Sequence, residues 1–406
     1  YCGVGTVNLQ VKLTIQGGWS TDMTVLDPVV YPTTLDAAHA GPVLRITEQT
    51  APTIENLILS NGSAPSGGCI YIKQSSVTLR NIQMRNCTAI SKGGGLYVDR
   101  FSKPVLVDSL IENSSANAAG AGIYIQESGA EIKDTIVRNN TGAADGGGIY
   151  LKKSDATISG STISGHTVTA DGGGIYLDGS AASIQNNTIS GNAAVWAGGG
   201  IFADNSPATI SFNRIENNSA DGIPVYVDLF LFKIDISGGG GGIYGRKSDM
   251  RITNNQIIGN RAPAVTGAGI HLWNGSQPQI DGNVVAKNTG NGIFLRLTPP
   301  IFKFYVLIPP IQPPPLDPTL IFPLPKPAPI RMRHNTIHAN TKGGVVIFGR
   351  TAIEMTDNII SANSTGVIGV SDFYLHIIFI MYAVPFVPIP IPIPIPIPTF
   401  YPPAAE

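Results

Sequence analysis

Glycine, aliphatic and aromatic residues recur along the chain in a fixed order, about once every 26 residues. Each recurrence begins with small residues, mostly glycine, and continues with an aliphatic and then usually an aromatic residue. The copies are GGCIY (67–71), GGGLY (93–97), GAGIY (120–124), GGGIY (146–150), GGGIY (172–176), GGGIF (198–202), GGGIY (240–244) and GAGIH (267–271). Successive starts lie 26, 27, 26, 26, 26, 42 and 27 residues apart, and a weaker copy, GNGIF, occupies 290–294. A period of this length is typical of solenoid repeats.

A second motif keeps the same period, with an aliphatic residue followed three positions later by asparagine. The copies are Ile58/Asn61, Leu110/Asn113, Val137/Asn140, Ile189/Asn192, Ile215/Asn218, Ile257/Asn260, Val285/Asn288, Ile337/Asn340 and Ile360/Asn363. Met84/Cys87 and Ile163/His166 vary the last residue. Two motifs that share one period over most of the chain indicate a single repeating architecture.

Within one period, short β-type runs alternate with turns. The period that starts at Gly146 contains runs at 149–151, 156–158 and 162–163, which are too short for helices and are interrupted by glycine. Three short strands and three turns in about 26 residues make one coil of a right-handed parallel β-helix. We therefore predict an all-β solenoid of about a dozen coils, each pairing in parallel with the next at roughly 4.8 Å.

Parallel pairing places equivalent side chains of successive coils above one another. We expect one set of aliphatic ladders to fill the core: Ile70, Leu96, Ile123, Ile149, Ile175, Ile201, Ile158, Ile184, Ile210 and Ile252. The asparagines of the second motif predict a structural ladder at a turn, because asparagine tolerates left-handed backbone and its amide can bond its counterparts above and below. His166 occupies one position of this ladder, and we interpret it as a structural substitution, not as a catalytic base.

An aromatic stripe is predicted on the outer face of the first strand of each coil. It consists of Tyr71, Tyr97, Tyr124, Tyr150, Tyr176, Phe202, Tyr244, His271 and Phe294. Side chains alternate between the two faces of a strand, so a residue between two inward aliphatic residues points outward and is expected to be exposed. Such a stripe could dock proline-rich segments or stack sugar rings. A ring stack that points inward is a third reading, which the alternation disfavours.

Three segments depart from the repeat. Insertions are predicted at about 219–237 and 297–330 of a β-helix that spans 1–370, and a proline-rich C-terminal arm follows at 371–406. The proposed assembly residues of this arm are Phe373, Phe386, Pro388, Pro390, Pro392, Pro394, Pro396 and Pro398. Proline removes hydrogen-bond donors, so these apolar segments suit extended arms and not the core. We favour docking onto a neighbouring copy of the chain over folding back onto the same coils.

Composition narrows the class of partner. Formal net charge is −1 and charged residues make up 13% of the chain, which argues against a nucleic-acid partner. No stretch of about 20 apolar residues suits a transmembrane helix. The chain starts at Tyr1 without methionine, so we expect a leader that was removed or lies outside this numbering. Cys2, Cys69 and Cys87 lack metal spacing and are interpreted as small buried side chains. Their odd number leaves at least one thiol free or bonded to another chain.

No catalytic constellation is found. The chain has no GxSxG, HExxH or phosphate-loop motif, and no catalytic residue, cofactor or metal ligand is assigned. Asp145 and Asp171 precede successive glycine starts and could hold calcium weakly, although a solvated turn is the favoured interpretation. Asp99, Asp178 and Asp204 fall among Lys73, Lys152 and Arg246, as on an ordinary mixed surface.

The paired motifs resemble the GGAI and FxxN repeats of polymorphic outer-membrane proteins and, more broadly, the pectate-lyase-like β-helix superfamily. The opening, with LTIQGGWS (13–20), TVLDP (24–28), TTLDA (33–37) and PTIENLILSNG (52–62), is similar to secreted β-helix repeat proteins of filamentous green non-sulfur bacteria. The resemblance covers about 8–297 and 331–370. It implies the fold and secretion to the cell surface, but not an activity, because the superfamily spans enzymes, adhesins and structural spikes.

These observations favour a non-enzymatic extracellular protein that assembles with its own copies into a filament or sheath through the arms. The alternative is a polysaccharide-binding adhesin, or a polysaccharide lyase or glycosidase, that uses the aromatic stripe.

Overall fold

The protein, in a computed structural model, is built from β-strands and turns. The structure describes residues 5–222, 226–229, 232–235, 238–263, 266–273, 276–296, 302–307, 330–348, 353–370, 375–380 and 389–390. Only the backbone is described for 226–235, 302–307, 375–380 and 389–390 within these ranges, and for residues 348 and 370. None of the described residues forms a helix of the length and apolarity that crossing a bilayer requires.

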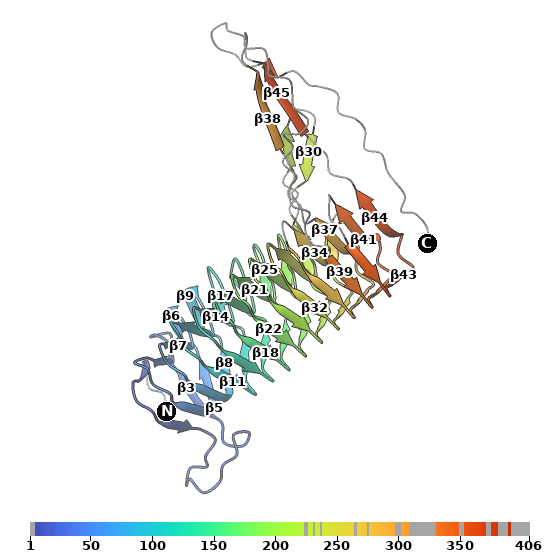
Figure 1. The fold of residues 1–406 in the computed structure, drawn as a ribbon. Coiled ribbons are helices and arrows are strands. Elements are labelled where there is room, and N and C mark those ends of the chain that lie inside the picture. Colours follow the sequence, from blue (N-terminus) through green and yellow to red (C-terminus); the bar gives the residue numbers. More distant parts are fainter. Residues whose placement is uncertain are drawn as a thin grey trace.

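The strands form three parallel ladders that run along one solenoid (Figure 1). The first ladder is a 13-stranded sheet: β1 (Val7–Leu9), β4 (Leu44–Ile46), β7 (Ile70–Lys73), β10 (Leu96–Asp99), β14 (Ile123–Gln126), β17 (Ile149–Lys152), β21 (Ile175–Asp178), β25 (Ile201–Asp204), β31 (Ile243–Arg246), β34 (Gly267–Trp273), β37 (Asn291–Arg296), β41 (Gly343–Phe348) and β44 (Thr365–Val370). Its register pairs Ile149 with Ile175 and Tyr150 with Tyr176, so equivalent positions of the repeat lie above one another as predicted.

The other two ladders share β5 (Thr53–Ser60) and β8 (Thr78–Arg85), which are long enough to belong to both. The second ladder adds β2 (Thr14–Gln16), β11 (Val105–Val107), β15 (Glu131–Lys133), β18 (Thr157–Ser159), β22 (Ser183–Gln185), β26 (Thr209–Ser211), β32 (Arg251–Thr253), β35 (Gln279–Asp281), β39 (Ile330–Arg333) and β42 (Ile353–Thr356). The third adds β3 (Thr33–Asp36), β12 (Leu110–Glu112), β16 (Ile136–Arg138), β19 (Thr162–Ser164), β23 (Thr188–Ser190), β27 (Arg214–Glu216), β33 (Gln256–Ile258), β36 (Val284–Ala286), β40 (Thr336–His338) and β43 (Ile359–Ser361). The predicted all-β parallel solenoid is confirmed.

Short strands reinforce the turn between the third ladder and the next coil. They are β6 (Ser63–Ser66), β9 (Thr88–Lys92), β13 (Ser115–Ala116), β20 (Thr167–Val168), β24 (Ala193–Ala194) and β28 (Ser219–Ala220). All of them pair in parallel with a neighbour one coil away.

One continuous aliphatic core runs through the coils, and all ten predicted core residues belong to it with at most 1% of their surface exposed. Burial of one such side chain contributes roughly 1.5–3 kcal/mol. A coil can bury its side chains on both faces only between two other coils, so each coil depends on its neighbours.

The glycine-rich starts are explained by two close approaches. Gly146 has φ of 61°, a left-handed conformation, and a Cβ there would lie 2.9 Å from the Tyr150 Cβ. A Cβ on Gly147 would lie 2.7 Å from the carbonyl oxygen of Gly173 in the next coil. The motif is therefore a turn that packs tightly against its own strand and against the coil above.

A disulfide joins Cys69 and Cys87, 18 residues apart, near the N-terminal end of the core. The interpretation of these two cysteines as merely small buried side chains was therefore wrong. The sequence motif assigned them to different positions of the repeat, and only the coiling of the chain brings their Cα atoms to 5.3 Å. Cys2 lies outside the described residues.

We expect the double variant Cys69→Ala/Cys87→Ala to lose about 3 kcal/mol of unfolding free energy, because the bond restricts a loop of this length in the unfolded chain. Urea titration measures the loss. Reduction of the wild-type protein should reproduce it, and an unchanged midpoint in both experiments would contradict it.

The two predicted insertions and the C-terminal segment leave the repeat. The first contains an antiparallel hairpin of β29 (Tyr226–Leu229) and β30 (Phe232–Asp235). The second contains β38 (Phe302–Leu307), which pairs in parallel with β45 (Leu375–Ile380), and β45 also pairs with β46 (Ile389–Pro390). Figure 1 shows β30, β38 and β45 projecting away from the coils. Pairing between the second insertion and the C-terminal segment of one chain was not foreseen.

Candidate functional site: the aromatic stack and the polar ladders

The predicted aromatic stripe is an ordered column of rings on the outer face of the first ladder. Six consecutive pairs from Tyr71 to Tyr244 are stacked, with ring centroids 4.6–5.5 Å apart and interplanar angles of 4–25°. This spacing follows the distance between coils, since each ring lies above its counterpart. The column points away from the aliphatic core, as the alternation predicted.

The stripe is not exposed as predicted. Tyr97, Tyr124, Tyr150, Phe202, Tyr244 and Phe294 are all buried. Each ring covers the face of the next, and turn residues such as Ala119 and Ala197 pack against the column. Sequence alternation assigns a side chain to a face of the sheet, but it does not show what covers that face.

Burial determines the electrostatics of the column. It raises the pKa of Tyr97 to about 12, and the negative charge of Asp99 adds to this effect. Burial also raises the pKa of Tyr150, whose hydroxyl donates to Asp178 Oδ2 at 3.3 Å. These phenols therefore stay protonated at neutral pH and do not act as bases.

Cations cover parts of the column. The Arg45 guanidinium carbon lies 4.9 Å from the centroid of the Tyr71 ring, and Lys92 Nζ lies 4.8 Å from that of Tyr124. Such cation–π contacts stabilise by about 0.5–1 kcal/mol at exposed sites. They further occupy ring surface that a sugar would need.

His271 interrupts the regular stacking. Its ring makes edge-on contacts with Tyr244 and Phe294, at centroid distances of 4.9 and 4.8 Å. The side chain is 1% exposed, and neither ring nitrogen has a hydrogen-bond partner among the described residues. Burial, with the charge of Arg296, lowers the pKa of His271 to about 3, so this imidazole is a neutral member of the apolar column.

The asparagine ladder joins coil to coil through both backbone and side chain. The Asn218 backbone N–H and its Nδ2 each donate to Asn260 Oδ1 at 3.0 Å, and Nδ2 also donates to the Ile189 carbonyl at 2.9 Å. Asn218 Oδ1 in turn accepts from the Asn192 backbone N–H and Nδ2. The same pattern continues through Asn288, Asn340 and Asn363.

Two of the predicted ladder residues, Asn61 and Asn113, lie one position too early. The register pairs Ile111, not Leu110, with Val137, so Ser114 occupies the ladder and donates its backbone N–H to Asn140 Oδ1 at 2.9 Å. Asn113 is exposed, with φ of 51°. Asn61, with φ of 55°, likewise precedes the ladder position and binds Asp36 instead. Left-handed backbone and amide stacking, which we assigned to one residue, belong to two neighbouring positions.

Two further polar ladders were missed. One passes through Ser109, Thr135, Ser161, Asn187, Asn213, Asn255, Asn283, Asn335 and Asn358, and the other through Ser75, Ser102, Ser128, Ser154, Ser180, Ser206, Ser248 and Ser276. In both, a side-chain oxygen accepts the backbone N–H of the preceding coil. The regular spacing of serine after each first strand could have revealed the second of them.

His166 imitates asparagine in its ladder. Its Nδ1 accepts from the Asn140 backbone N–H at 3.1 Å, and its Nε2 lies 3.0 Å from the Val137 carbonyl, to which the neutral ring donates. Its own backbone N–H donates to Asn192 Oδ1. Burial lowers the pKa of His166 to about 4. The geometry agrees with the structural interpretation of this residue.

The variant His166→Asn should be less sensitive to acid than the wild type. A folded-state pKa below the usual value of 6.5 means that the unfolded chain binds the proton first, so wild-type stability falls as pH decreases from 6.5 towards 4. We expect the variant to retain on the order of 3 kcal/mol more unfolding free energy than the wild type near pH 4. Urea titrations at pH 8 and pH 4 measure this, and an equal acid loss in both proteins would contradict it.

The two carboxylates considered for calcium do lie together. Asp145 Oδ1 accepts the backbone N–H of Asp171 at 3.1 Å. Burial and the negative charge of Asp145 raise the pKa of Asp171 to about 7. Among the described residues, no group of three or more His, Cys, Asp or Glu side chains could hold a metal ion. Calcium binding thus stays an untested expectation. Because ionised Asp145 and Asp171 repel each other, we expect the fold to lose stability when Asp171 ionises.

The structure does not describe the side chains of the proposed assembly residues of the C-terminal arm. Phe373, Phe386, Pro388, Pro392, Pro394, Pro396 and Pro398 lie outside the described residues, and Pro390 is described by its backbone alone. All prolines of the second insertion also lie outside the described residues.

Comparison with known proteins bears on the fold. The family model described as a right handed beta helix region matches four overlapping segments, 37–146, 68–235, 121–298 and 230–378. No curated protein and no solved structure matches the chain. Since the matched segments span most of the sequence, the chain belongs to the right-handed β-helix family.

Proposed function

We propose that this protein is a rigid extracellular structural element that assembles end to end with its own copies and is not an enzyme. Its 13-stranded first ladder makes a rod of roughly 58 Å at about 4.8 Å per coil. Three polar ladders, the ring column and the aliphatic core all repeat at that spacing, which favours stiffness along the axis.

The proposal rests on one observation: the core side chains at the C-terminal end of the solenoid are only partly buried. Ile353, Met355, Ile360 and Val367 continue the inward ladders but are only partly buried, whereas their counterparts in the middle coils are fully buried. The last strand of the first ladder, β44, pairs only with β41 among the described residues. A second copy that stacks on this end would bury the side chains and pair the open edge.

Such stacking continues the solenoid. The edge strand at the other end of the ladder is β1, which pairs with β4 on one side in the described part of the chain. Contact between the two different ends of identical chains is heterologous, and it produces an open filament if the rotation does not close a ring. The proline-rich arms would then act as lateral or axial clasps between copies.

The disulfide between Cys69 and Cys87 supports the extracellular assignment, because such bonds persist in oxidising compartments. The carbohydrate alternative, which relied on stacking sugars along the aromatic stripe, loses support because the ring faces are covered by one another. A lyase or glycosidase would also need free carboxylates, and Asp178 and Asp204 are engaged by Lys152 and Arg246 at 3.5 and 2.7 Å.

Electron microscopy and sedimentation of the purified protein test the proposal. We expect the wild type to form linear assemblies. A protein that stays monomeric at all concentrations would overturn the proposal. Val367→Lys should abolish them by placing a charge on the open end. The matched control Val284→Lys changes an exposed valine on the side of the rod and should assemble normally.

Deletion of 371–406 separates the contribution of the arm. Loss or weakening of assembly would support a clasp by this segment, and unchanged filaments would indicate that end stacking alone suffices. Assemblies that survive both Val367→Lys and the deletion unchanged would contradict the mechanism.

A further inference from the structure

The aromatic column contains one histidine, at a position that tyrosine or phenylalanine occupies in the neighbouring coils. His271 on β34 pairs in register with Tyr244 on β31 and with Phe294 on β37. Both nitrogens of its ring are buried, and neither has a hydrogen-bond partner in the part of the chain that the structure describes. A Cβ on Gly239 would lie 2.5 Å from His271 Nδ1, so the backbone closes this side of the ring. The column therefore encloses a polar ring without satisfying it.

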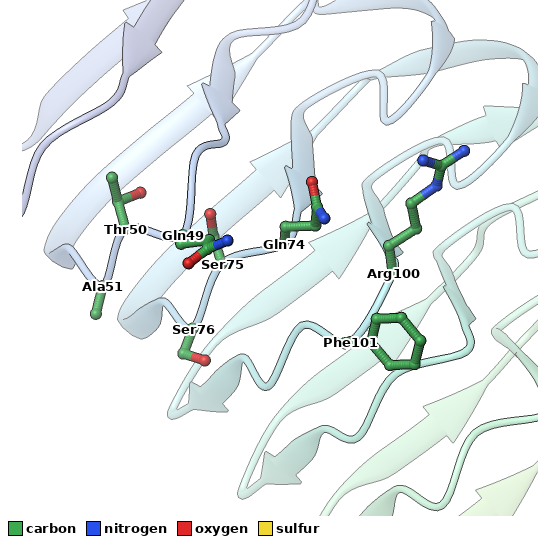
Figure 2. A pocket seen from close by; sticks show the side chains of 8 residues that line it. All are labelled: Gln49, Thr50, Ala51, Gln74, Ser75, Ser76, Arg100 and Phe101. Carbon is green, nitrogen blue, oxygen red and sulfur yellow. The ribbon is translucent and has the colours of Figure 1, made fainter.

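Polar side chains on the surface of the solenoid are in a different situation. The exposed side chains of Gln49, Gln74 and Arg100, for example, line an open depression at the turns near the N-terminal end (Figure 2). Water reaches such groups and can bond them whether or not the protein does. No water reaches the nitrogens of His271, and a buried polar group without a partner is rare enough in native structures to require an explanation.

The surroundings of the ring offer nothing that would accept a proton. Burial, and then the positive charge of Arg296 on β37, lower the pKa of His271 to about 3. Arg246, Asp171 and Asp204 act on the Tyr244 hydroxyl, which burial keeps protonated by raising its pKa. No carboxylate of the described residues shifts the pKa of His271. The other residues around the ring are uncharged: Gly239, Thr266, Trp273 and Phe294.

His271 lies where the regular middle coils end. The first insertion leaves the solenoid before this coil, and the second leaves it after β37, so that β30 and β38 project on the same side (Figure 1). The pairing of β34 with β37 shifts register between Gly267 and Ile270. In the middle coils β17 and β21 pair without such a shift. The coil of His271 is therefore a boundary between regular and irregular stacking.

The C-terminal coils, which we define as the solenoid strands from β34 to β44, can open without the rest. A coil of a solenoid contacts only its neighbours, so opening from one end breaks a single interface between coils. Core side chains at this end, such as Ile353 and Val367, are only partly buried, and they oppose opening less than the fully buried ones. Opening would bring the ring of His271 into water, where it can bind a proton freely.

We propose that His271 is an acid switch: its protonation opens the C-terminal coils while the middle coils stay folded. The closed state is fully favoured above pH 6.5, the ordinary pKa that the ring regains on opening. Each pH unit below 6.5 raises the ratio of open to closed molecules about tenfold, until the lower pKa of the closed state is reached. In the proposed filament, opening would remove the end on which the next copy stacks. That consequence rests on the proposed function, whereas the opening itself does not.

Native-state hydrogen exchange of the full chain at pH 7 and pH 5 tests the switch, after correction for the intrinsic exchange rates. We expect the amides of Ile270 and Ile293 in the C-terminal coils to exchange roughly 25-fold faster at pH 5. The amides of Ile149 and Ile175 in the middle coils should remain the slower ones at pH 5. Equal rates at the two pH values, or one common rate for all coils at pH 5, would overturn the inference.

Two neutral replacements separate the switch from mere packing. His271→Phe introduces the ring that the column already has at Phe294, and the exchange of its C-terminal coils should not depend on pH. His271→Gln is neutral but packs less well, so these coils should open more at both pH values and equally at each. His166→Asn is the control, because it removes a buried histidine from the middle coils and should leave the acid response of the C-terminal coils intact. A 25-fold response that persists in both His271 variants would contradict the proposal.

Sedimentation at the same two pH values tests the consequence for assembly. Wild-type assemblies should dissociate at pH 5, and those of His271→Phe should persist. The two proposals fail in different ways. A protein that never assembles but shows the exchange response would overturn the filament and support the switch. Filaments whose exchange does not depend on pH would support the filament and overturn the switch.

Discussion

Asn218→Leu should lower the free energy of unfolding by roughly 3–6 kcal/mol, although leucine matches the volume and burial of the site. The change removes the donors to the Ile189 carbonyl and to Asn260 Oδ1, and the acceptor for the Asn192 amide. Each buried group that is left without a partner costs about 1–3 kcal/mol. The loss spreads over three coils, because one amide connects the coil before it with the coil after it.

The neighbouring residue provides the control. Asn217 occupies the left-handed position of the same turn, with φ of 54°, so Asn217→Gly should change stability by less than about 1 kcal/mol. Urea unfolding compares the two variants, and hydrogen exchange at the Asn192 amide shows whether the damage is local. Equal stabilities for Asn218→Leu and the wild type would mean that apolar packing alone holds the coils together.

The architecture could be predicted because periodicity is a property of the sequence itself. Copies of one motif at a constant interval, such as GGGIY at 146–150 and 172–176, require identical surroundings in successive coils, and parallel stacking supplies them. The core residues followed from the same argument. Aliphatic residues that recur at the same position of every repeat can all be buried together only if the coils lie above one another.

The register at one turn could not be predicted with the same certainty. Leu110 and Ile111 are both aliphatic, and either one satisfies the spacing to a following polar residue. The structure selects Ile111 for the core because the pairing partner Val137 points inward. A motif that tolerates a shift of one residue cannot determine which asparagine is the stacked one and which is the turn residue.

The environment of the aromatic stripe also depended on information beyond the pattern. Alternation placed Tyr124 on the outer face correctly, yet its side chain is one of the largest fully buried ones among the described residues. Its neighbours above and below, at 5.5 and 5.1 Å, are distant in sequence. The Cys69–Cys87 bond likewise depends on the coiling of the chain, which brings together two cysteines that lie 18 residues apart.

Asp171→Asn should stabilise the protein at pH 8, in contrast to most substitutions of partly buried residues. Burial, and then the carboxylate of Asp145, raise the pKa of Asp171 to about 7 from the ordinary value of 3.8. Between these values the folded chain keeps a proton that the unfolded chain releases, so stability falls as pH rises from 4 to 7. Asparagine is uncharged and keeps an oxygen that can accept the Ala197 backbone N–H.

We expect the gain at pH 8 to be on the order of 3 kcal/mol, because the pKa of Asp171 is raised to about 7 and solvent around the partly exposed carboxylate reduces the effect. It should disappear below pH 4, where both proteins are neutral at this position. Urea titrations across pH 4–8 measure the difference, and an NMR titration of the Asp171 carboxyl should show its pKa falling in Asp145→Asn.

Asp178→Asn is the control on the same coil. This carboxylate accepts from the Tyr150 hydroxyl and lies 3.5 Å from Lys152 Nζ, so its removal at pH 8 should cost less than about 1 kcal/mol instead of stabilising. A gain in unfolding free energy for Asp171→Asn together with a loss for Asp178→Asn would show that the repulsion is between the Asp145 and Asp171 carboxylates and does not involve Asp178. A loss of stability in Asp171→Asn at pH 8 would show instead that the ionised carboxylate has a partner, and a bound cation between Asp145 and Asp171 would then be the first candidate to examine.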